Sequence, residues 1–351
     1  MGCGEAHTIA VVGPEGSELA STGQNDAGQT GRGGSMNLES LGKVSLPPGT
    51  LEEPIRLLAC GQHHTILVLE SGLVFGFGEN EAGQLGLGTH IGRPGFSAEG
   101  HTSQSSSDVL QPTRVTGLDG QAISEVVCGA QHTLALYGDG SLWGSGSNTF
   151  GELGFGAQRK AINAFAEVPY SSGGPDEVDV RVVHLVCGLR HSLFLNGLGQ
   201  VMGCGDNSKG QLGLGHVSKQ FTLKVLRVEA NRIKVMGCGR WHSALLSETK
   251  EVFVTGDNSQ GQLGLPTTRA TTSFLKSKAL SKPNLQWVGC GGDFTICLDF
   301  EGAAYGVGYN EDGALSLGHC NNVWEPQRVV CGGRRIKEIV CGLYHTFLAV
   351  Q

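Results

Sequence analysis

Hydrophobic residues in this chain fall into short runs separated by glycine-rich turns. In residues 60–88 one run covers residues 65–69 and another covers residues 73–77, with Ser71-Gly72 between them. Short runs rich in Val, Ile, Leu and Phe and bounded by glycine predict β-strands. A turn of sequence GENEAGQLG follows at residues 78–86. A unit with so few strands cannot bury its own apolar faces, so we expect it to pack against copies of itself.

The copies are present along the whole chain. The opening of the unit is Cys-Gly-x-x-His at Cys60, Gly61 and His64, and its copies contain His7, His132, His191, His242 and His345. A seventh opening has Phe294 in place of the His. The turn has an asparagine at its third position in six copies, namely Asn25, Asn80, Asn148, Asn207, Asn258 and Asn310. Several strands in each copy, repeated at intervals of about fifty residues, predict a β-propeller or a similar array.

We interpret the repeated residues as structural. The cysteine is expected to be a small buried thiol, and the imidazole to be satisfied by backbone groups of the turn. The asparagines are expected to form the turn, because Asn can bond to its own backbone and tolerates a left-handed conformation. One Cys and one His in each copy would not converge on one point, whereas a zinc site needs about four ligands. We therefore expect no metal and no cofactor, and no catalytic motif is present.

The opening and the turn together resemble the repeat of the regulator of chromosome condensation family. The resemblance extends from Cys3 to the C-terminus and implies an all-β, seven-bladed β-propeller, a single domain over residues 1–351. Members of this family serve as nucleotide exchange factors, photoreceptors and scaffolds, so the motif identifies the fold more specifically than the function.

Composition narrows the choice of partner and compartment. The formal net charge is −7 and the basic residues are scattered, so direct binding to nucleic acid is not expected. No apolar run approaches twenty residues and no secretion leader is apparent. Seven of the eleven cysteines occupy one repeat position. Their separation around a ring argues against disulfides, which favours the cytoplasm or the nucleus.

Three segments are longer than the repeat requires: residues 32–54, 89–111 and 157–180. We interpret them as inserted loops that follow the glycine turn and precede the outer strand, all on one face of the propeller. They are either tolerated surface length or a clamp for a partner, and the serine tract at residues 103–107 is a candidate phosphorylation segment.

The two residues between the Gly and the His of the opening vary from copy to copy. Because every copy turns at the same point, these pairs should surround one end of the channel. The candidate partner-binding residues in this rim are Gln62, His63, Gln131, Arg190, Arg240, Trp241, Asp293 and Tyr344. Trp, Tyr and Arg are the residue types that anchor interfaces, although a solvated turn with arbitrary residues is the alternative. The family resemblance implies that partners dock on this rim.

Two functions compete. In the first, the protein is a non-catalytic platform that presents the rim to a protein partner, for which a small GTPase is a candidate. In the second, it is a guanine nucleotide exchange factor for a Ran-like small GTPase. The resemblance links that activity to a wedge-like loop in place of one glycine turn, and to an acidic residue before the repeat His. Only Asp293 matches the acidic position, and all six turns keep the plain length, so the platform is favoured. A tryptophan-cage photoreceptor is less expected, because only Trp241 of the four tryptophans lies at the rim.

The two ends of the chain predict an unusual seventh blade. The chain is expected to start at the second strand of a unit, because Met1-Gly2 leaves no room for a first strand, and to end in another second strand at residues 346–350. Seven second strands but six of each other kind would leave the seventh blade incomplete, with an exposed edge or strands borrowed from a partner. We expect Met1 to be an internal start, about 45 residues short of a closed ring. A six-bladed ring is the rival, with residues 335–340 as the first strand of the first blade.

Overall fold

A computed structural model of the chain describes residues 1–13, 16–50, 53–88, 107–118, 122–170 and 181–351. Most of the second expected insertion, including residues 103–106 of the serine tract, lies outside these ranges. The chain divides into two compact units, which are described separately. Unit 1 comprises Met1–Thr149 and Phe155–Pro169, and unit 2 comprises Phe150–Gly154 and Tyr170–Gln351.

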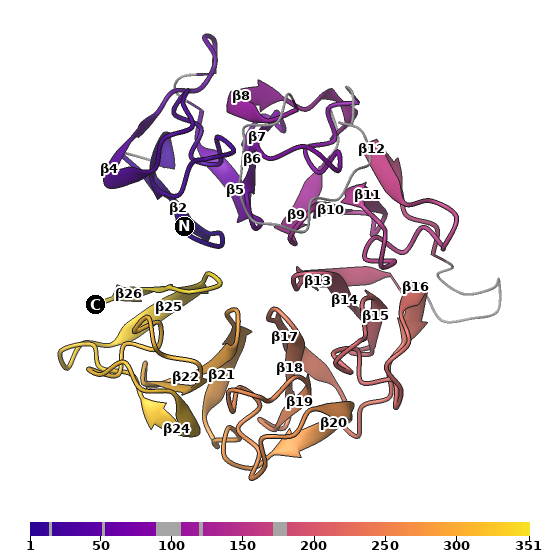
Figure 1. Cartoon of the computed structure of the whole chain (residues 1–351), viewed down its shortest axis with the longest axis vertical. Coiled ribbons are helices and arrows are strands. Elements are labelled where there is room, and N and C mark those ends of the chain that lie inside the picture. The colour runs from indigo at the N-terminus through magenta and orange to yellow at the C-terminus, as the bar shows by residue number, and fades with distance from the viewer. Residues whose placement is uncertain (14–15, 51–52, 89–106, 119–121, 171–180) are drawn as a thin grey trace. The chain divides into compact units, whose positions relative to one another are not determined.

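Unit 1 contains three four-stranded antiparallel sheets, each formed from consecutive strands (Figure 1). The first sheet consists of β1 (Gly2–Cys3), β2 (His7–Val12), β3 (Glu18–Gly23) and β4 (Leu38–Val44). The second consists of β5 (Ile55–Cys60), β6 (His64–Leu69), β7 (Val74–Gly78) and β8 (Val109–Arg114). After the 3-10 helix η2 (Thr116–Leu118), the third consists of β9 (Ile123–Cys128), β10 (His132–Tyr137), β11 (Leu142–Ser147) and β12 (Ala161–Glu167).

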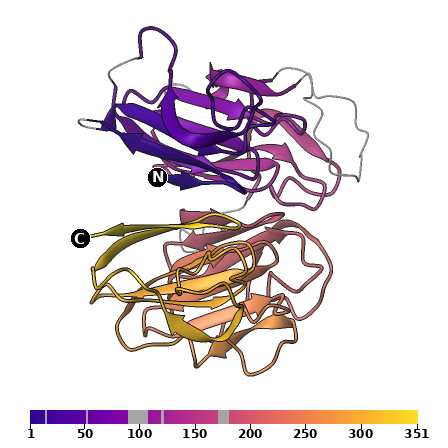
Figure 2. The ribbon, with the colours of Figure 1, turned by 60° about the vertical axis from the view of Figure 1, so that its left-hand side comes forward.

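Unit 2 repeats this plan in three more sheets and ends in a hairpin. Its first sheet consists of β13 (Val182–Cys187), β14 (His191–Asn196), β15 (Val201–Gly205) and β16 (Gln220–Val225). The next consists of β17 (Ile233–Cys238), β18 (His242–Ser247), β19 (Val252–Gly256) and β20 (Thr271–Ser277). The last four-stranded sheet consists of β21 (Leu285–Cys290), β22 (Phe294–Asp299), β23 (Ala304–Gly308) and β24 (Val323–Arg328). Figure 2 shows the hairpin, β25 (Ile336–Cys341) and β26 (Thr346–Val350), in yellow.

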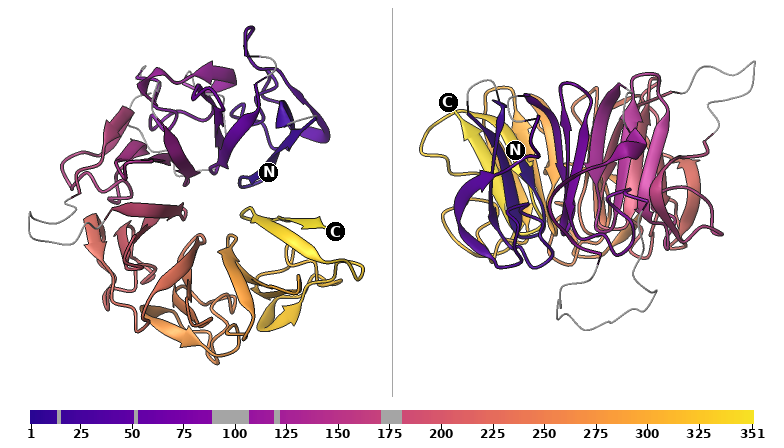
Figure 3. Two further views of the ribbon diagram at one scale, coloured as in Figure 1. Left: turned by 180° about the vertical axis from the view of Figure 1, so that it is seen from behind. Right: turned by 90° about the horizontal axis from the view of Figure 1, so that it is seen from above.

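The apolar core of each unit lies between consecutive sheets. All six residues are buried in the second strand of five sheets, namely in β6, β10, β14, β18 and β22. Ile66 and Val74 of the second sheet pack in one cluster with Val126 and Tyr137 of the third. Within each unit the first strands lie at the inner side and the fourth strands at the outer side (Figures 1 and 3). Apolar runs such as residues 65–69 therefore form strands because both of their faces are covered by neighbouring sheets.

A glycine ends the third strand of most sheets and fixes the turn that follows. Gly78 has φ +105°, and a Cβ built on it would lie 2.3 Å from the carbonyl oxygen of His63. Gly205 and Gly308 repeat this conformation, with φ of +114° and +112°. A residue with a side chain would be strained there and would also meet the backbone of the turn between the first and second strands. The spacing of the repeat is therefore fixed by backbone contacts.

The structure corrects two expectations about strand positions. Gly2–Cys3 forms the first strand β1, in which Gly2 pairs with Ile9 and Cys3 with Thr8, so the chain does have room for a first strand. The described residues thus contain seven first strands, seven second strands and six of each other kind. The six-bladed rival is wrong, because residues 336–341 pair with β26 and not with the first sheet. The first and third expected insertions contain the outer strands β4 and β12 themselves.

The expectation of a single domain over residues 1–351 remains a prediction. In the described part of the chain, no helix is long and apolar enough to cross a membrane.

Candidate functional site

The rim residues lie in the turn between the first and second strand of each sheet. In the six four-stranded sheets the first strand ends at the repeat cysteine and the second begins at the repeat His or Phe, so the three residues between them form the turn; in the hairpin the second strand begins one residue later, at Thr346. Each unit therefore presents its own set of rim turns at equivalent ends of its sheets.

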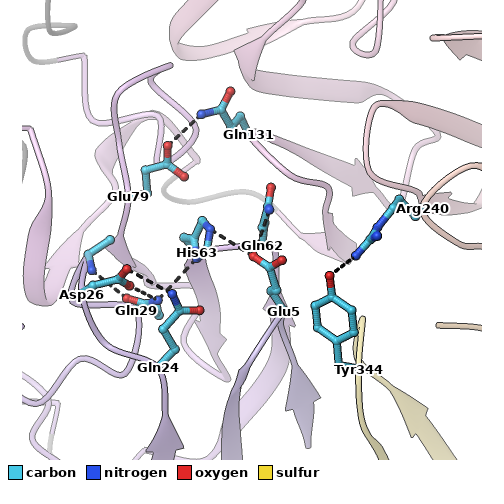
Figure 4. A network of polar contacts seen from close by, with 11 residues as sticks. Glu5, Gln24, Asp26, Gln29, Gln62, His63, Glu79, Gln131, Arg240 and Tyr344 are labelled. Carbon is cyan, nitrogen blue, oxygen red and sulfur yellow. Dashed lines mark hydrogen bonds and ion pairs between the residues drawn. The ribbon is translucent and has the colours of Figure 1, made fainter. Parts of the chain in front are cut away.

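In unit 2, three rim residues from successive turns contact one another. Arg240 Nη1 lies 3.3 Å from Asp293 Oδ2, and the two side chains are 23% and 19% exposed. Arg240 Nη2 donates a hydrogen bond to Tyr344 Oη (Figure 4), and its Cζ lies 5.1 Å from the centre of the Tyr344 ring. Burial raises the pKa of Asp293, and the positive charge of Arg240 opposes this shift. The three side chains are thus held in one arrangement by an ion pair, a hydrogen bond and a cation–π contact.

The other two rim residues of unit 2 belong to a second cluster. Arg190 Cζ lies 4.7 Å from the centre of the Phe150 ring and 5.9 Å from that of Trp241. Lys219 Nζ lies 4.0 Å from the centre of the same Phe150 ring. Since Trp241 follows Arg240 directly in the chain, the two clusters adjoin and bring together all five rim residues of unit 2.

Phe150 and Lys219 were missed by the sequence interpretation. Phe150 is the fifth residue of its glycine turn, a position held by Ala27, Ala82, Lys209, Gln260 and Asp312 in the other copies. A large aromatic residue at one copy of an otherwise small or polar turn position was the available signal. Lys219 lies between β15 and β16, outside any motif, and gave none.

The rim of unit 1 is built from amides and carboxylates. Gln62 Nε2 donates to Glu5 Oε2 over 2.9 Å, and His63 Nε2 lies 3.1 Å from the same oxygen. Gln131 Nε2 donates to Glu79 Oε1 over 2.7 Å. Figure 4 shows these contacts, in which each rim amide is turned toward a carboxylate of a neighbouring sheet. The three rim residues expected in unit 1 therefore form part of a polar network that also contains Glu5 and Glu79.

Glu79 is electrostatically unusual. Its Oε2 is buried and has no hydrogen-bond partner among the described residues. Burial raises the pKa of Glu79 to about 7, while the bond from Gln131 lowers it and the nearby carboxylates of Glu81, Asp108 and Asp26 raise it. A carboxyl group of this pKa could exchange protons near neutral pH. The hydrogen-bond partner of Glu79 is the Gln131 amide, however, and an amide is not a nucleophile that the Glu79 carboxylate could activate as a base.

The repeat histidines join neighbouring sheets. His64 Nε2 lies 2.9 Å from Thr133 Oγ1 in the next sheet, and His242 Nε2 lies 3.0 Å from Thr295 Oγ1. We expected backbone groups of the turn to satisfy these imidazoles. That expectation is wrong for the Nε2 atoms, whose partners are hydroxyl groups of the next sheet. Burial lowers the pKa of His64 to about 3 and that of His242 to about 4. Such imidazoles stay neutral at physiological pH, which agrees with a structural role.

The other histidines of the opening have similar surroundings. His7 and His191 bond to the hydroxyl groups of Thr65 and Ser243 in the next sheet, over 3.2 Å and 3.0 Å. Burial lowers the pKa of His132 to about 3. His345 packs edge-on against Phe347.

The repeat asparagines stabilise the glycine turns through longer connections than expected. Asn80 Oδ1 accepts from the N–H of Leu85 over 3.0 Å, and the equivalent bonds at Asn207, Asn258 and Asn310 are each 2.9 Å. Asn148 donates to the carbonyl oxygens of Gly156 and Arg159. None of the asparagines has a positive φ, so the expected left-handed conformation is wrong. Their role is to hold the turn across five or more residues.

The pKa of several buried thiols is raised, which makes them poorly reactive. All eleven cysteines of the sequence are described, and none of them forms a disulfide bond. Burial raises the pKa of Cys60 to about 12, so the thiolate that would bind a metal or attack an electrophile is not populated at neutral pH. Within the described ranges, no group of three or more His, Cys, Asp or Glu side chains is placed to hold a metal ion.

Known proteins resemble this chain over most of its length. The ultraviolet-B receptor UVR8 of Arabidopsis thaliana is 29% identical over 311 residues, which are 87% of this chain and 64% of the receptor. The human probable E3 ubiquitin-protein ligase HERC6 is 31% identical over 74% of this chain, but the match covers 23% of that protein. The chain therefore spans less than two thirds of either relative.

A solved structure agrees with the fold. The crystal structure of Prp20p from Saccharomyces cerevisiae, described with its binding properties to Gsp1p and histones, superposes with a TM-score of 0.79. The match covers 99% of this chain and 80% of Prp20p at 21% identity, so it bears on the fold alone. The expected all-β, seven-bladed propeller of regulator of chromosome condensation type is confirmed. The profile of the RCC1-like domain matches residues 1–348, and the chain belongs to the RCC1-like domain family.

Proposed function

We propose that this protein is a non-catalytic interaction platform that presents its rim turns to a protein partner. The observation that carries the proposal is the cluster of Arg190, Arg240, Trp241, Asp293 and Tyr344 in unit 2. Trp, Tyr and Arg supply most of the binding energy at protein interfaces. A small GTPase is the class of partner that the family resemblance favours, and the reducing compartments of the cytoplasm and nucleus are the proposed locations.

The contacts within the cluster support a partner-binding role rather than a solvated turn with arbitrary residues. Long side chains in a solvated turn would sample many rotamers, and fixing each of them on binding costs about 0.5–1.5 kcal/mol. Here Arg240 is already fixed by Asp293 and Tyr344, so a partner meets a surface that is ordered in advance. Preorganisation of this kind increases affinity without new contacts.

The proposal is tested by affinity capture with the whole chain. The double variant Arg240→Ala/Trp241→Ala should lose a protein that the wild type captures reproducibly, while its circular dichroism and thermal unfolding remain close to those of the wild type. A matched control is Trp324→Ala/Arg328→Ala, which removes the same two residue types from β24, where the Trp324 side chain is 48% exposed. Equal loss in both double variants, or no loss in the rim variant, would refute a rim-directed platform.

Guanine nucleotide exchange on a Ran-like GTPase is the alternative function. The acidic residue that the resemblance points to, Asp293, lies next to Phe294 and is already paired with Arg240. We expect little acceleration of the release of a fluorescent GDP analogue from such a GTPase. Acceleration of several hundredfold that disappears in Asp293→Ala would replace the platform by the exchange factor.

A further inference from the structure

Two cations beside the Phe150 ring of unit 2 form no ion pair with an acidic residue in the described part of the chain. The Arg190 guanidinium and the Lys219 ammonium contact the Phe150 ring, and the guanidinium also lies over Trp241. Neither group forms an ion pair or a side-chain hydrogen bond with any other residue that the structure describes. Both lie within 5 Å of one ring centre, so no more than about 9 Å separates the two positive charges.

The neighbouring rim residue Arg240, by contrast, forms an ion pair with a carboxylate of the same rim. Asp293 Oδ2 lies 3.3 Å from Arg240 Nη1, and the Asp293 side chain is 19% exposed. The backbone N–H of Asp206 donates to the carbonyl oxygen of Arg190, but the Asp206 carboxylate is engaged elsewhere. The Asp206 carboxylate accepts bonds from the N–H and hydroxyl of Ser208, over 3.1 Å and 3.0 Å. The charge of Arg240 is therefore compensated by Asp293, whereas the charge of Arg190 is compensated by no described carboxylate.

From this contrast we propose that Arg190, Lys219 and the Phe150 ring form a subsite for the carboxylate of an acidic segment in the protein partner. The inference rests on the proposed platform function and specifies the chemistry of the partner at one point of the rim. A guanidinium held against aromatic rings keeps its N–H donors for an external acceptor, and it can offer a carboxylate two parallel bonds. The ammonium of Lys219 adds a second charge to the same site.

A protein carboxylate fits the surroundings better than a nucleic acid does. The chain carries a net charge of −7, and a phosphate backbone would be attracted only by a broad run of cations. Here two cations stand beside the apolar surfaces of Phe150 and Trp241. Such a site suits an Asp or Glu side chain with an apolar neighbour in the same segment.

The test uses a fluorescein-labelled decapeptide of alternating glutamate and leucine, with the whole chain and fluorescence anisotropy as the readout. The wild type should bind it, and binding should weaken as salt is raised. Arg190→Gln should weaken binding about tenfold and Lys219→Gln about threefold, the loss of charge-assisted contacts. Lys276→Gln is the matched control and should change affinity less than twofold, because Lys276 is exposed on β20, outside the rim turns, and is paired with Glu251. Thermal unfolding of each variant checks that the fold is retained.

Several outcomes would overturn the subsite. They are absence of binding at millimolar peptide, equal binding of the peptide with glutamine in place of glutamate, and equal effects of Arg190→Gln and Lys276→Gln. Tighter binding of a phosphoserine peptide or of single-stranded DNA would assign the two cations to phosphate. If a partner is captured through Arg240 and Trp241 but is indifferent to Arg190→Gln, the subsite fails and the platform stands. If nothing is captured and the acidic peptide does not bind, both fail.

Discussion

Replacement of His64 by phenylalanine should make the protein less sensitive to acid. The chain already accepts this exchange in one repeat, where Phe294 pairs with Gly308 in the register in which His64 pairs with Gly78. Both side chains are fully buried. The phenylalanine variant should therefore occupy the same slot without rearranging the strand.

The magnitude follows from the pKa of His64, which is lowered from 6.5 to about 3. The causes are burial first, then the charges of His132, His7 and His63. The unfolded chain therefore binds one more proton than the folded chain between these pH values. The stability from keeping this imidazole neutral is complete above pH 6.5 and is lost as the pH falls toward 3. At pH 5 the loss amounts to about 2 kcal/mol, since each pKa unit corresponds to about 1.4 kcal/mol.

The substitution also removes a hydrogen bond. His64 Nε2 lies 2.9 Å from Thr133 Oγ1, and this hydroxyl still donates to the carbonyl oxygen of Gln84 over 2.7 Å after the change. The variant should accordingly be about 1 kcal/mol less stable than the wild type at pH 7. At pH 5 the order should reverse, with the variant about 1 kcal/mol more stable.

Urea unfolding followed by circular dichroism at pH 7, 6 and 5 measures this crossing. His216→Gln is the control, because His216 is exposed and its replacement should have little effect on the free energy of unfolding. A difference between His64→Phe and the wild type that stays constant within about 0.5 kcal/mol from pH 7 to 5 would contradict the assigned pKa and the burial behind it.

Three further changes test other parts of the fold by the same unfolding assay. The pKa of Glu79 is raised from 4.5 to about 7, so its contribution to stability is present below pH 4.5 and is lost as the pH rises to 7. Glu79→Gln should therefore stabilise by about 3 kcal/mol at pH 8 and by little at pH 4.5, and equal effects at the two pH values would refute this. Gly78→Ala should destabilise by more than about 2 kcal/mol because of its φ of +105° and the 2.3 Å approach to backbone oxygen, whereas Gly34→Ala, with no atom within 4 Å, should be nearly neutral. Asn80→Ala should cost about 1–2 kcal/mol by leaving the buried N–H of Leu85 unpaired, and a neutral result would contradict the turn-holding role.

The sequence predicts the repeated part of the fold well because the same residues occur at the same spacing in each copy. The strands beginning at His64 and His191 and the glycine turns follow directly from the motif. The short strand Gly2–Cys3 could not be foreseen, because two residues carry no periodicity and their pairing with β2 is decided by the packed sheet. The sequence analysis placed the outer strand β4 in an expected loop, because six of its seven residues are exposed or half-buried and four of the seven are polar or glycine.

The candidate site divides in the same way. A shared repeat position sufficed to propose that Arg240, Asp293 and Tyr344 lie together. Phe150 and Lys219 come from other segments of the repeat than Arg190, and only the folded unit 2 brings the two cations to one aromatic ring. The contact between Glu79 and Gln131 likewise joins two sheets, and no pattern within one repeat encodes it.

His7, His64, His191 and His242 each bond to a hydroxyl in the following sheet, and this has a consequence for how each unit unfolds. The Thr133 hydroxyl contacts His64 Nε2 of the preceding sheet and donates a hydrogen bond to the carbonyl oxygen of Gln84 in the turn of that sheet. The Thr295 hydroxyl makes the equivalent contacts with His242 Nε2 and the carbonyl oxygen of Gln262. If one sheet unfolds by itself, buried polar atoms of the neighbouring sheet therefore lose their hydrogen-bond partners as well. In repeat arrays, such coupling between nearest neighbours makes unfolding propagate from sheet to sheet instead of stopping at one. Within each unit, hydrogen exchange should thus report collective opening of adjacent sheets, with the amides of β6 and β10 exchanging at a common rate.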